Sequence, residues 1–171
     1  RDRLPVREEE SVFAHHGEAR PSWGAGRLEG LVPAEHEPFL EVLSAEPFLD
    51  LLQAFRQDAR DATYATWDDL LGYCRGSANT VGRIVLALHD VDDPQALRES
   101  DAVCTALQLT NFWQDLGPDL KRGRLFIPLE DLQRFGIARD AITRAASRAA
   151  LSRLLTHECR ATDDLFQRSR R

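Results

Sequence analysis

From about residue 36 onwards, apolar residues recur with the period of an α-helix. The first such stripe occupies positions i, i+3, i+4 and i+7 and consists of Phe48, Leu51, Leu52 and Phe55. This spacing places side chains on one helical face, so we expect a helix that turns them to the core. Residues 1–33 instead mix charges with glycine and proline. That pattern predicts a loop-rich or poorly ordered segment before a helical domain at residues 34–171.

Two capping signals mark where later helices begin. Thr66 stands three residues before Asp69, the arrangement of a capping box. Asp93 is followed by Pro94, an N-cap residue with proline at the first helical position. We expect the helix after Asp93 to run to about residue 120, because Gly123 then breaks the pattern.

The last third of the chain continues the helical pattern. A short extended apolar crossing at residues 125–128 precedes a brief helix at 129–135 and a longer one from about residue 139. The sequence contains neither an alternating strand pattern nor an internal repeat. The predicted fold class is therefore all-α.

Composition narrows the class of protein. A length of 171 residues with 43% hydrophobic content suits one domain with a sizeable core. The net charge of −6 argues against nucleic-acid binding, which requires a basic patch, but allows an anionic substrate held through Mg²⁺. No apolar run reaches the ~18 residues of a spanning helix, so we expect a cytoplasmic protein and leave peripheral contact with the inner membrane open. The 3 cysteines form no CxxC pair, which agrees with packing roles in a reducing cytoplasm.

The helix predicted after Asp93 carries a polar stripe within an apolar sequence. Residues 102–113 are apolar nearly all round, which is typical of a helix buried on most sides. Four polar residues nevertheless fall within a sector of about 80° of that helix: Gln108, Asn111, Asp115 and Asp119. Because burying an unpaired amide costs ~2–7 kcal/mol, this face must meet polar partners, a metal or a water-filled cavity.

Two interpretations of this stripe remain open on the residues alone. Asp115 and Asp119 are one helical turn apart and suit Mg²⁺ bound to a diphosphate. They could equally be exposed acids at a helix end, beside hydrogen-bonded core amides. Three cations follow at once and could neutralise a leaving diphosphate or form a solvated basic loop: Lys121, Arg122 and Arg124.

Small residues crowd a second stretch, residues 73–82, within a predicted helix. Each glycine there costs about 1 kcal/mol relative to alanine, so a reason for the small residues is needed. One reason is close helix–helix packing, and the other is a channel wall that lets a long apolar substrate lie against the backbone.

Both stretches resemble the squalene/phytoene synthase family. The first reads Tyr-Cys-x-x-Ser-Ala-x-x-Val-Gly at residues 73–82. The second reads Leu-Gln-Leu-Thr-Asn-Phe-Trp-Gln-Asp-Leu-Gly-Pro-Asp-Leu-Lys-Arg-Gly-Arg-Leu-Phe-Ile-Pro at residues 107–128. The resemblance covers residues 47–137 and implies the class I isoprenoid synthase helical fold, here as a partial domain.

The resemblance also implies roles for individual residues. Asp115 and Asp119 would form the second of the family's two aspartate-rich magnesium motifs, with Gln108 and Asn111 lining the cavity beside them. The prenyl channel would be lined by Tyr73, Ser77, Val81 and Gly82. The implied substrates are prenyl diphosphates, presqualene or farnesyl diphosphate, and the implied cofactor is Mg²⁺.

Residues 112–115, Phe-Trp-Gln-Asp, are similar to the branch that converts presqualene diphosphate to hydroxysqualene with loss of diphosphate. Head-to-head condensation to squalene or phytoene is the alternative within the family. A non-catalytic helical partner module is the alternative from another class.

Two departures from the family pattern affect these expectations. The first aspartate-rich motif is not found, since neither residues 8–10 nor residues 90–93 have its sequence. Pro118 stands between the two acids and would bend the helix, because it cannot donate a hydrogen bond to the carbonyl of Gln114. Because the resemblance implies magnesium held between two acidic motifs and only one is found, we expect this chain to be inactive alone. Family members are also longer at both ends, so we expect it to self-associate through uncovered apolar surface.

Overall fold

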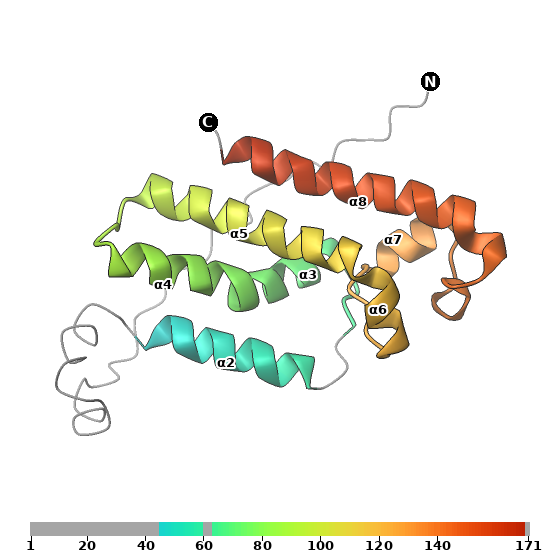
Figure 1. The fold of residues 1–171 in the computed structure, drawn as a ribbon, viewed down its shortest axis with the longest axis horizontal. Coiled ribbons are helices and arrows are strands. Elements are labelled where there is room, and N and C mark those ends of the chain that lie inside the picture. The colour runs from blue at the N-terminus through green and yellow to red at the C-terminus, as the bar shows by residue number, and fades with distance from the viewer. Residues whose placement is uncertain (1–44, 60–62, 170–171) are drawn as a thin grey trace. The chain divides into compact units, whose positions relative to one another are not determined.

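Helices make up all the regular secondary structure of the described residues, 45–59 and 63–169 of this computed structural model. In chain order they are α2 (Glu46–Asp58), α3 (Trp67–Cys74), the π-helix η3 (Arg75–Asn79), α4 (Thr80–Leu88), α5 (Pro94–Gln114), α6 (Leu116–Lys121), α7 (Leu129–Arg134), the short 3₁₀ turns η4 (Arg139–Ala141) and η5 (Ala145–Ser147), and α8 (Arg148–Arg168). These elements lie within one compact unit (Figure 1). The all-α fold class is confirmed, while the expectation for residues 1–33 lies outside the described residues.

Both capping signals act as the sequence predicts. The Thr66 hydroxyl accepts a hydrogen bond from the Asp69 amide at 3.2 Å, and the Asp69 carboxylate accepts one from the Thr66 amide at 2.9 Å. The Asp93 carboxylate caps α5 by accepting from the amide of Ala96 at 2.7 Å. Orphan amides of the first helical turn are thereby satisfied, which fixes where α3 and α5 begin.

The helix expected to run from Asp93 to about residue 120 is interrupted. α5 ends at Gln114, and α6 begins at Leu116 after Asp115, whose ψ angle of 8° is not helical. The cause is Pro118, which has no amide hydrogen to donate to the carbonyl of Gln114. The prediction of one long helix was therefore wrong, whereas the bend expected at Pro118 is present.

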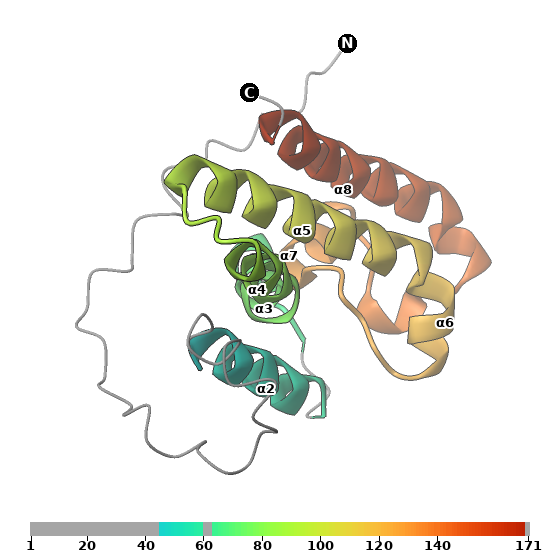
Figure 2. The ribbon, with the colours of Figure 1, turned by 60° about the vertical axis from the view of Figure 1, so that its left-hand side comes forward.

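α3, η3 and α4 follow one another without a break and run antiparallel to α5 (Figures 1 and 2). The ring centroids of Tyr73 and Phe112 are 6.0 Å apart at one end of this interface. Further along, the Thr105 hydroxyl donates a hydrogen bond to the Asn79 side chain, and Arg83 pairs with Asp101. Residue numbers rise along α3, η3 and α4 while those of their partners fall along α5, as expected for antiparallel helices. The contacting pairs are Tyr73 with Phe112, Asn79 with Thr105, and Arg83 with Asp101.

α8 packs along the other side of α5, so that α5 lies between α8 and α4 in both views (Figures 1 and 2). The indole of Trp113 donates a hydrogen bond to the Thr162 hydroxyl at 2.9 Å and ties the two helices together. α5 is thus covered on two sides by neighbouring helices. No helix within the described residues is long and apolar enough to cross a membrane.

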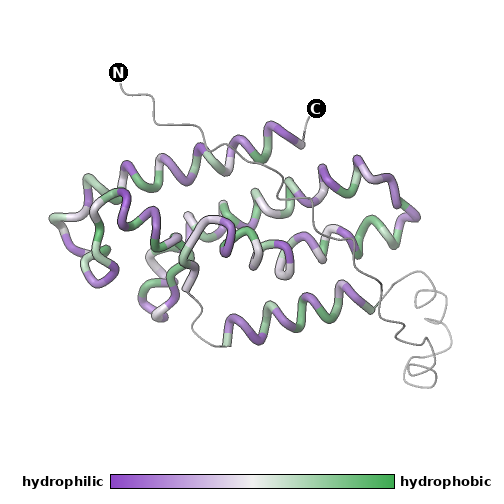
Figure 3. The backbone as a smooth tube through the Cα atoms, turned by 180° about the vertical axis from the view of Figure 1, so that it is seen from behind, coloured by the Kyte–Doolittle hydropathy of each residue, from purple (hydrophilic) through white to green (hydrophobic). Residues whose placement is uncertain are grey.

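α2 does not face the core with its apolar stripe, contrary to the expectation from the sequence. Phe48, Leu52 and Phe55 are 43%, 54% and 57% exposed, and Ala54 is the buried residue of this helix. Apolar residues recur along α2 in Figure 3, yet the helix meets η3 through its small-residue side. A Cβ added at Gly76 would lie 3.4 Å from the Asp50 carbonyl oxygen and 3.6 Å from the Ala54 Cβ, so α2 and η3 approach each other closely on this side.

The extended crossing predicted at residues 125–128 links the two halves of the fold. After it, the amides of Leu129 and Glu130 donate to the carbonyls of Tyr64 and Ala65 at 2.9 and 3.1 Å. The Glu130 carboxylate also accepts from the amide of Trp67 at 2.7 Å, where an acid is favourable at a helix N-terminus. The chain after α6 is therefore anchored on the beginning of α3.

Candidate active site

The C-terminal half of α5 presents polar and apolar side chains on one exposed face. Leu107, Asn111 and Asp115 follow one another at intervals of four residues, so they stack along that face. Leu107 is 52% exposed, and Asn111 and Asp115 are also exposed. Gln108 lies beside them, half-buried. The face thus passes from an apolar side chain to an amide and then to a carboxylate.

Leu107 is the member of this face that the polar stripe predicted from the sequence did not include. A signal was present, because Leu107 stands one helical turn before Asn111. Sequence reasoning treated residues 102–113 as buried nearly all round, which hid an apolar residue that is open to solvent. Because Leu107 is exposed and lies four residues before Asn111, we include it in the candidate site.

Asp119 occupies a different environment from Asp115. It is buried, at 8% exposure, in α6 beyond the bend. Its backbone carbonyl accepts hydrogen bonds from the amides of Arg122 and Arg124, each at 2.9 Å. Its carboxylate lies 3.8 Å from the Arg122 guanidinium. Asp119 therefore orders the basic loop, whose cations Lys121, Arg122 and Arg124 are all exposed.

The four residues predicted to line a prenyl channel fall into different environments. Tyr73 is in the core, at 6% exposure, whereas Val81 is 47% exposed. The half-buried Ser77 donates to the Tyr73 carbonyl at 2.9 Å, one helical turn back. Gly82 faces α5, since a Cβ there would lie 2.6 Å from both Ser100 Oγ and Cys104 Sγ. Gly82 thus has a packing role, and its place beside a channel stays a prediction.

Tyr73 belongs to an aromatic cluster beneath the exposed face of α5. Its ring centroid lies 5.5 Å from that of Tyr64 and 6.0 Å from that of Phe126. Phe126 in turn stacks on Phe112 of α5 with centroids 3.9 Å apart and planes 2° from parallel. Burial and a hydrogen bond to Asp58 raise the pKa of Tyr73, so its hydroxyl stays protonated at neutral pH.

Asp115 and Asn111 fit a magnesium ion that also binds a diphosphate. Mg²⁺ takes oxygen ligands and is usually held by one or two carboxylates together with phosphate oxygens. The exposed carboxylate of Asp115 and the exposed amide oxygen of Asn111 stand one turn apart on α5. Within the described part of the chain, no group of three or more acidic, histidine or cysteine side chains is arranged so that it could hold a metal ion.

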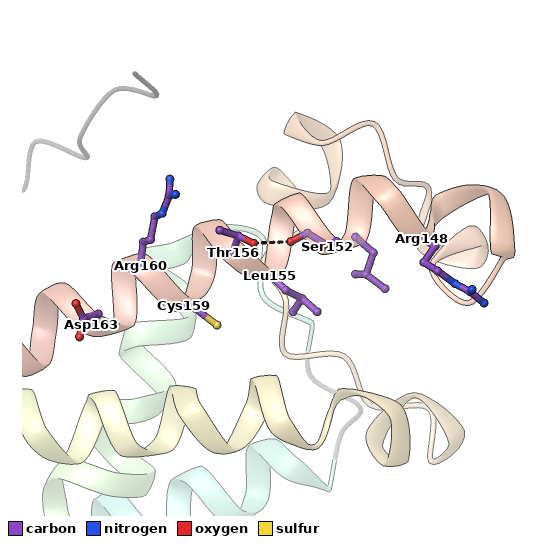
Figure 4. A pocket seen from close by; sticks show the side chains of 8 residues that line it. Arg148, Ser152, Leu155, Thr156, Cys159, Arg160 and Asp163 are labelled. Carbon is purple, nitrogen blue, oxygen red and sulfur yellow. Dashed lines mark hydrogen bonds between the residues drawn. The ribbon is translucent and has the colours of Figure 1, made fainter. Parts of the chain in front are cut away.

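A hollow of about 590 Å³ lies elsewhere, along α8. Leu155, Cys159 and Arg160 are among its lining residues, and all the described lining residues come from α8 (Figure 4). None of the predicted site residues borders it. The candidate site is thus the exposed face of α5 and not this hollow.

Comparison with known proteins identifies the family to which this chain is similar. A family model for squalene/phytoene synthase matches residues 27–171. The hydroxysqualene synthase of Zymomonas mobilis is 37% identical over 122 residues, which are 71% of this chain and 41% of that protein. The 15-cis-phytoene synthase of Synechocystis sp. is 34% identical over 131 residues, covering 64% of this chain and 39% of that protein.

A solved structure shares the helical arrangement. The squalene synthase HpnC from Alicyclobacillus acidocaldarius superposes with a TM-score of 0.70 and 43% sequence identity, over 75% of this chain and 49% of that one. The fold is therefore that of squalene synthase-type isoprenoid synthases. The chain belongs to the squalene/phytoene synthase family, whose members are enzymes that act on prenyl diphosphates. It spans about two fifths of the length of the curated relatives it matches, at 41%, 34% and 37% of the first three.

Proposed function

We propose that the protein carrying this chain converts presqualene diphosphate and water to hydroxysqualene and diphosphate, with Mg²⁺ as cofactor. The observation that carries the proposal is the exposed face of α5, where Leu107, Asn111 and Asp115 follow one another. A prenyl diphosphate has a matching polarity, with an apolar chain and an anionic end. The similarity of this chain to hydroxysqualene synthases supports this substrate over others in the family.

The residues of the face divide the work along the substrate. Asp115 and Asn111 would hold the magnesium–diphosphate end, and Asp119 would join them as a second carboxylate by exchanging Arg122 for the ion. A bound Mg²⁺ supplies charge stabilisation to a departing diphosphate. Because Lys121 and Arg124 are exposed next to this end, they can bind the same phosphate oxygens.

The apolar residues act on the other end of the substrate. Leu107 and Val81 are about half exposed, at 52% and 47%, and offer contact area to a prenyl chain. Apolar surface that is removed from water contributes roughly 25 cal/mol per Å² to the free energy of binding. Covering that surface would also exclude bulk water, so that one water molecule rather than many can reach the carbon that loses diphosphate.

Head-to-head condensation of farnesyl or geranylgeranyl diphosphate is the second candidate, supported by the similarity to 15-cis-phytoene synthase. The same acid face would serve it, because diphosphate also leaves in that reaction. The difference between the two reactions lies in the substrate and in whether water ends the sequence.

Product analysis distinguishes these reactions. The protein, expressed with any flanking sequence that its gene encodes, is incubated with presqualene diphosphate and separately with farnesyl diphosphate. We expect hydroxysqualene from presqualene diphosphate in the presence of Mg²⁺ and none after chelation. Squalene or phytoene from farnesyl diphosphate would establish the second candidate. Absence of product from both substrates would favour a non-catalytic helical partner.

The same assay tests the site through Asp115→Asn, which keeps the shape of the side chain and removes its charge. Turnover should fall by a factor of about 100 or more, since losing a few kcal/mol of leaving-group stabilisation has that effect. Asp92→Asn is the matched control, because Asp92 is an exposed acid just before the opposite end of α5. Near-normal turnover in Asp115→Asn would contradict the assignment.

A further inference from the structure

An ion pair joins α4 to α5 away from the candidate site, with a buried Asp101 carboxylate and an Arg83 side chain that is 48% exposed. Asp101 is 4% exposed and accepts two hydrogen bonds from Arg83, Nε to Oδ1 at 3.0 Å and Nη2 to Oδ2 at 2.6 Å. A carboxylate so deeply buried is costly unless it is paired in this way. The two parallel bonds also fix direction, because the planar guanidinium matches the carboxylate in only one orientation.

A second polar link and a close approach lie in the same interface. One turn from the ion pair, the Thr105 hydroxyl donates to Asn79 Oδ1 at 2.8 Å, and these two residues are 7% and 5% exposed. Between the two links, Gly82 allows the helices to approach so closely that a Cβ would collide with α5. Apolar contacts tolerate sliding of one helix along another, whereas these directional bonds are lost on a small shift.

These links come directly after η3, where the helical phase changes. A π-helix fits one extra residue into a turn, so it rotates everything after it relative to everything before it. Such turns are rare and occur often at functional sites. Asn79 is the last residue of η3, and Arg83 lies one turn into α4. The two links therefore hold α4 against α5 in the phase that η3 sets.

Arg83 also lies within reach of α2. Its pKa is raised first by the hydrogen bonds to Asp101, with smaller contributions from Asp50 and Glu46 of α2, while burial opposes the increase. Arg83 thus stands where three helices meet. Its guanidinium stays charged, so the pair with Asp101 is not lost by deprotonation of the arginine.

We propose that Arg83 and Asp101 are positioning residues for the proposed reaction. Their ion pair holds the register between α4 and α5. In that register Ser77, which lies between Tyr73 and Asn79, stays level with the part of α5 that carries Leu107 and Asn111. The proposal rests on the proposed function, because the register matters only if this face binds the reacting substrate.

A shift in register would affect turnover more than binding. The substrate would contact residues of α5 and residues of the continuous helices η3 and α4. Sliding α5 against η3 and α4 would therefore misplace the reacting carbon. A misplacement of about 1 Å costs on the order of 100-fold in rate. The apolar contact area that sets most of the affinity changes little over such a distance.

The test compares kcat and KM for presqualene diphosphate in Arg83→Met, Arg83→Lys and the exchanged pair Arg83→Asp/Asp101→Arg. Assays are run well below the melting temperature of every variant, so that each protein is folded. We expect Arg83→Met to lower kcat by about 10- to 100-fold with KM changed less than about threefold. Arg83→Lys keeps the charge and one hydrogen bond and should recover part of kcat, as should the exchanged pair.

Arg144→Met is the matched control, because Arg144 forms an exposed pair with Asp140 at 3.0 Å in the segment before α8. Its kcat should equal that of the wild type. If Arg83→Met lowers the melting temperature but leaves kcat unchanged, the pair is only structural and the proposal fails. If Arg83→Met does not fold, Arg83→Lys decides: an unchanged kcat overturns the proposal. A wild type that makes no product instead contradicts the proposed function, so the two failures are distinguishable.

Discussion

The environment of a single side chain can differ from what its neighbours in the sequence suggest, as the buried hydroxyl of Tyr64 shows. Tyr64 is 2% exposed, and its hydroxyl finds no hydrogen-bond partner within the described residues. Burial and the nearby charge of Asp58 raise the pKa of this phenol. A buried hydroxyl without a partner costs about 1–3 kcal/mol of desolvation. The aromatic ring is useful to the core, whereas the hydroxyl group destabilises it.

Replacing Tyr64 with phenylalanine should therefore stabilise the protein. We expect Tyr64→Phe to raise the free energy of unfolding by about 1 kcal/mol, because the ring contacts stay and the desolvated hydroxyl is gone. Urea unfolding followed by circular dichroism measures the change. Tyr73→Phe is the control, since the Tyr73 hydroxyl has a hydrogen bond to Asp58 to lose and should not stabilise. A loss of stability in Tyr64→Phe would mean that the hydroxyl has a partner.

The residue scale also shows how far the site could be predicted. Helical spacing placed Gln108, Asn111 and Asp115 on one face, because α5 runs without a break to Gln114 and Asp115 is its C-cap residue. The same spacing placed Asp119 with them, and Pro118 was expected to bend the helix before it. The bend is present, and the Asp119 carboxylate lies 3.8 Å from the Arg122 guanidinium. The burial of Tyr73 depends on side chains far away in the sequence, such as Phe126, which spacing cannot give.

At the scale of elements, helix starts were predictable and helix orientation was not. Thr66 and Asp93 cap helices through bonds to residues three positions away, so the sequence contains both partners. Whether the stripe of α2 faces the core depends on what packs against it, and the close contact at Gly76 turns the other side inward. The π-helix η3 was likewise not predicted, because the sequence shows only a run of small residues there and not the hydrogen-bond spacing.

Gly82 and Gly117 should respond oppositely to substitution by alanine. Each change gains about 1 kcal/mol of helix propensity. At Gly82 the added Cβ would lie 2.6 Å from Ser100 Oγ and Cys104 Sγ, whereas nothing lies within 4 Å of the Cβ at Gly117. Because overpacking costs ~1–3 kcal/mol, we expect Gly82→Ala to be less stable than Gly117→Ala by about that amount.

Chemical denaturation of the two variants measures this difference. Adding Cys104→Ala to Gly82→Ala removes one of the two colliding atoms and should restore part of the loss. If Gly82→Ala is as stable as Gly117→Ala, the two helices can separate at no cost, and the register argued for α4 and α5 is weaker than the contacts suggest.

At the scale of the whole molecule, the core is built around groups that are neutral only while they hold a proton. Tyr64, Tyr73 and Cys74 all belong to one buried cluster, which α2, α3 and α5 enclose together. Burial raises the pKa of Cys74 from 9.0 to about 12. The pKa values of the two tyrosines are also raised above 10.0, chiefly by burial. The folded core therefore keeps these protons to a higher pH than the unfolded chain does.

The stability of the protein should consequently decline in alkali. Well below pH 9.0, the ordinary pKa of a thiol, the three groups are protonated in both states and contribute no slope. Above it the unfolded chain releases the Cys74 proton while the folded core retains it, and above pH 10.0 the tyrosines add to the effect. Since the folded state then binds more protons than the unfolded state, the free energy of unfolding falls as the pH rises.

Urea midpoints measured between about pH 8 and pH 11 test this expectation. The midpoint should begin to fall near pH 9 and fall more steeply above pH 10. Tyr64→Phe removes one of the three groups, so its decline above pH 10 should be shallower than that of the wild type. A wild-type midpoint that stays constant up to pH 11 would show that these groups ionise as readily in the folded core as in the unfolded chain, and would contradict their burial.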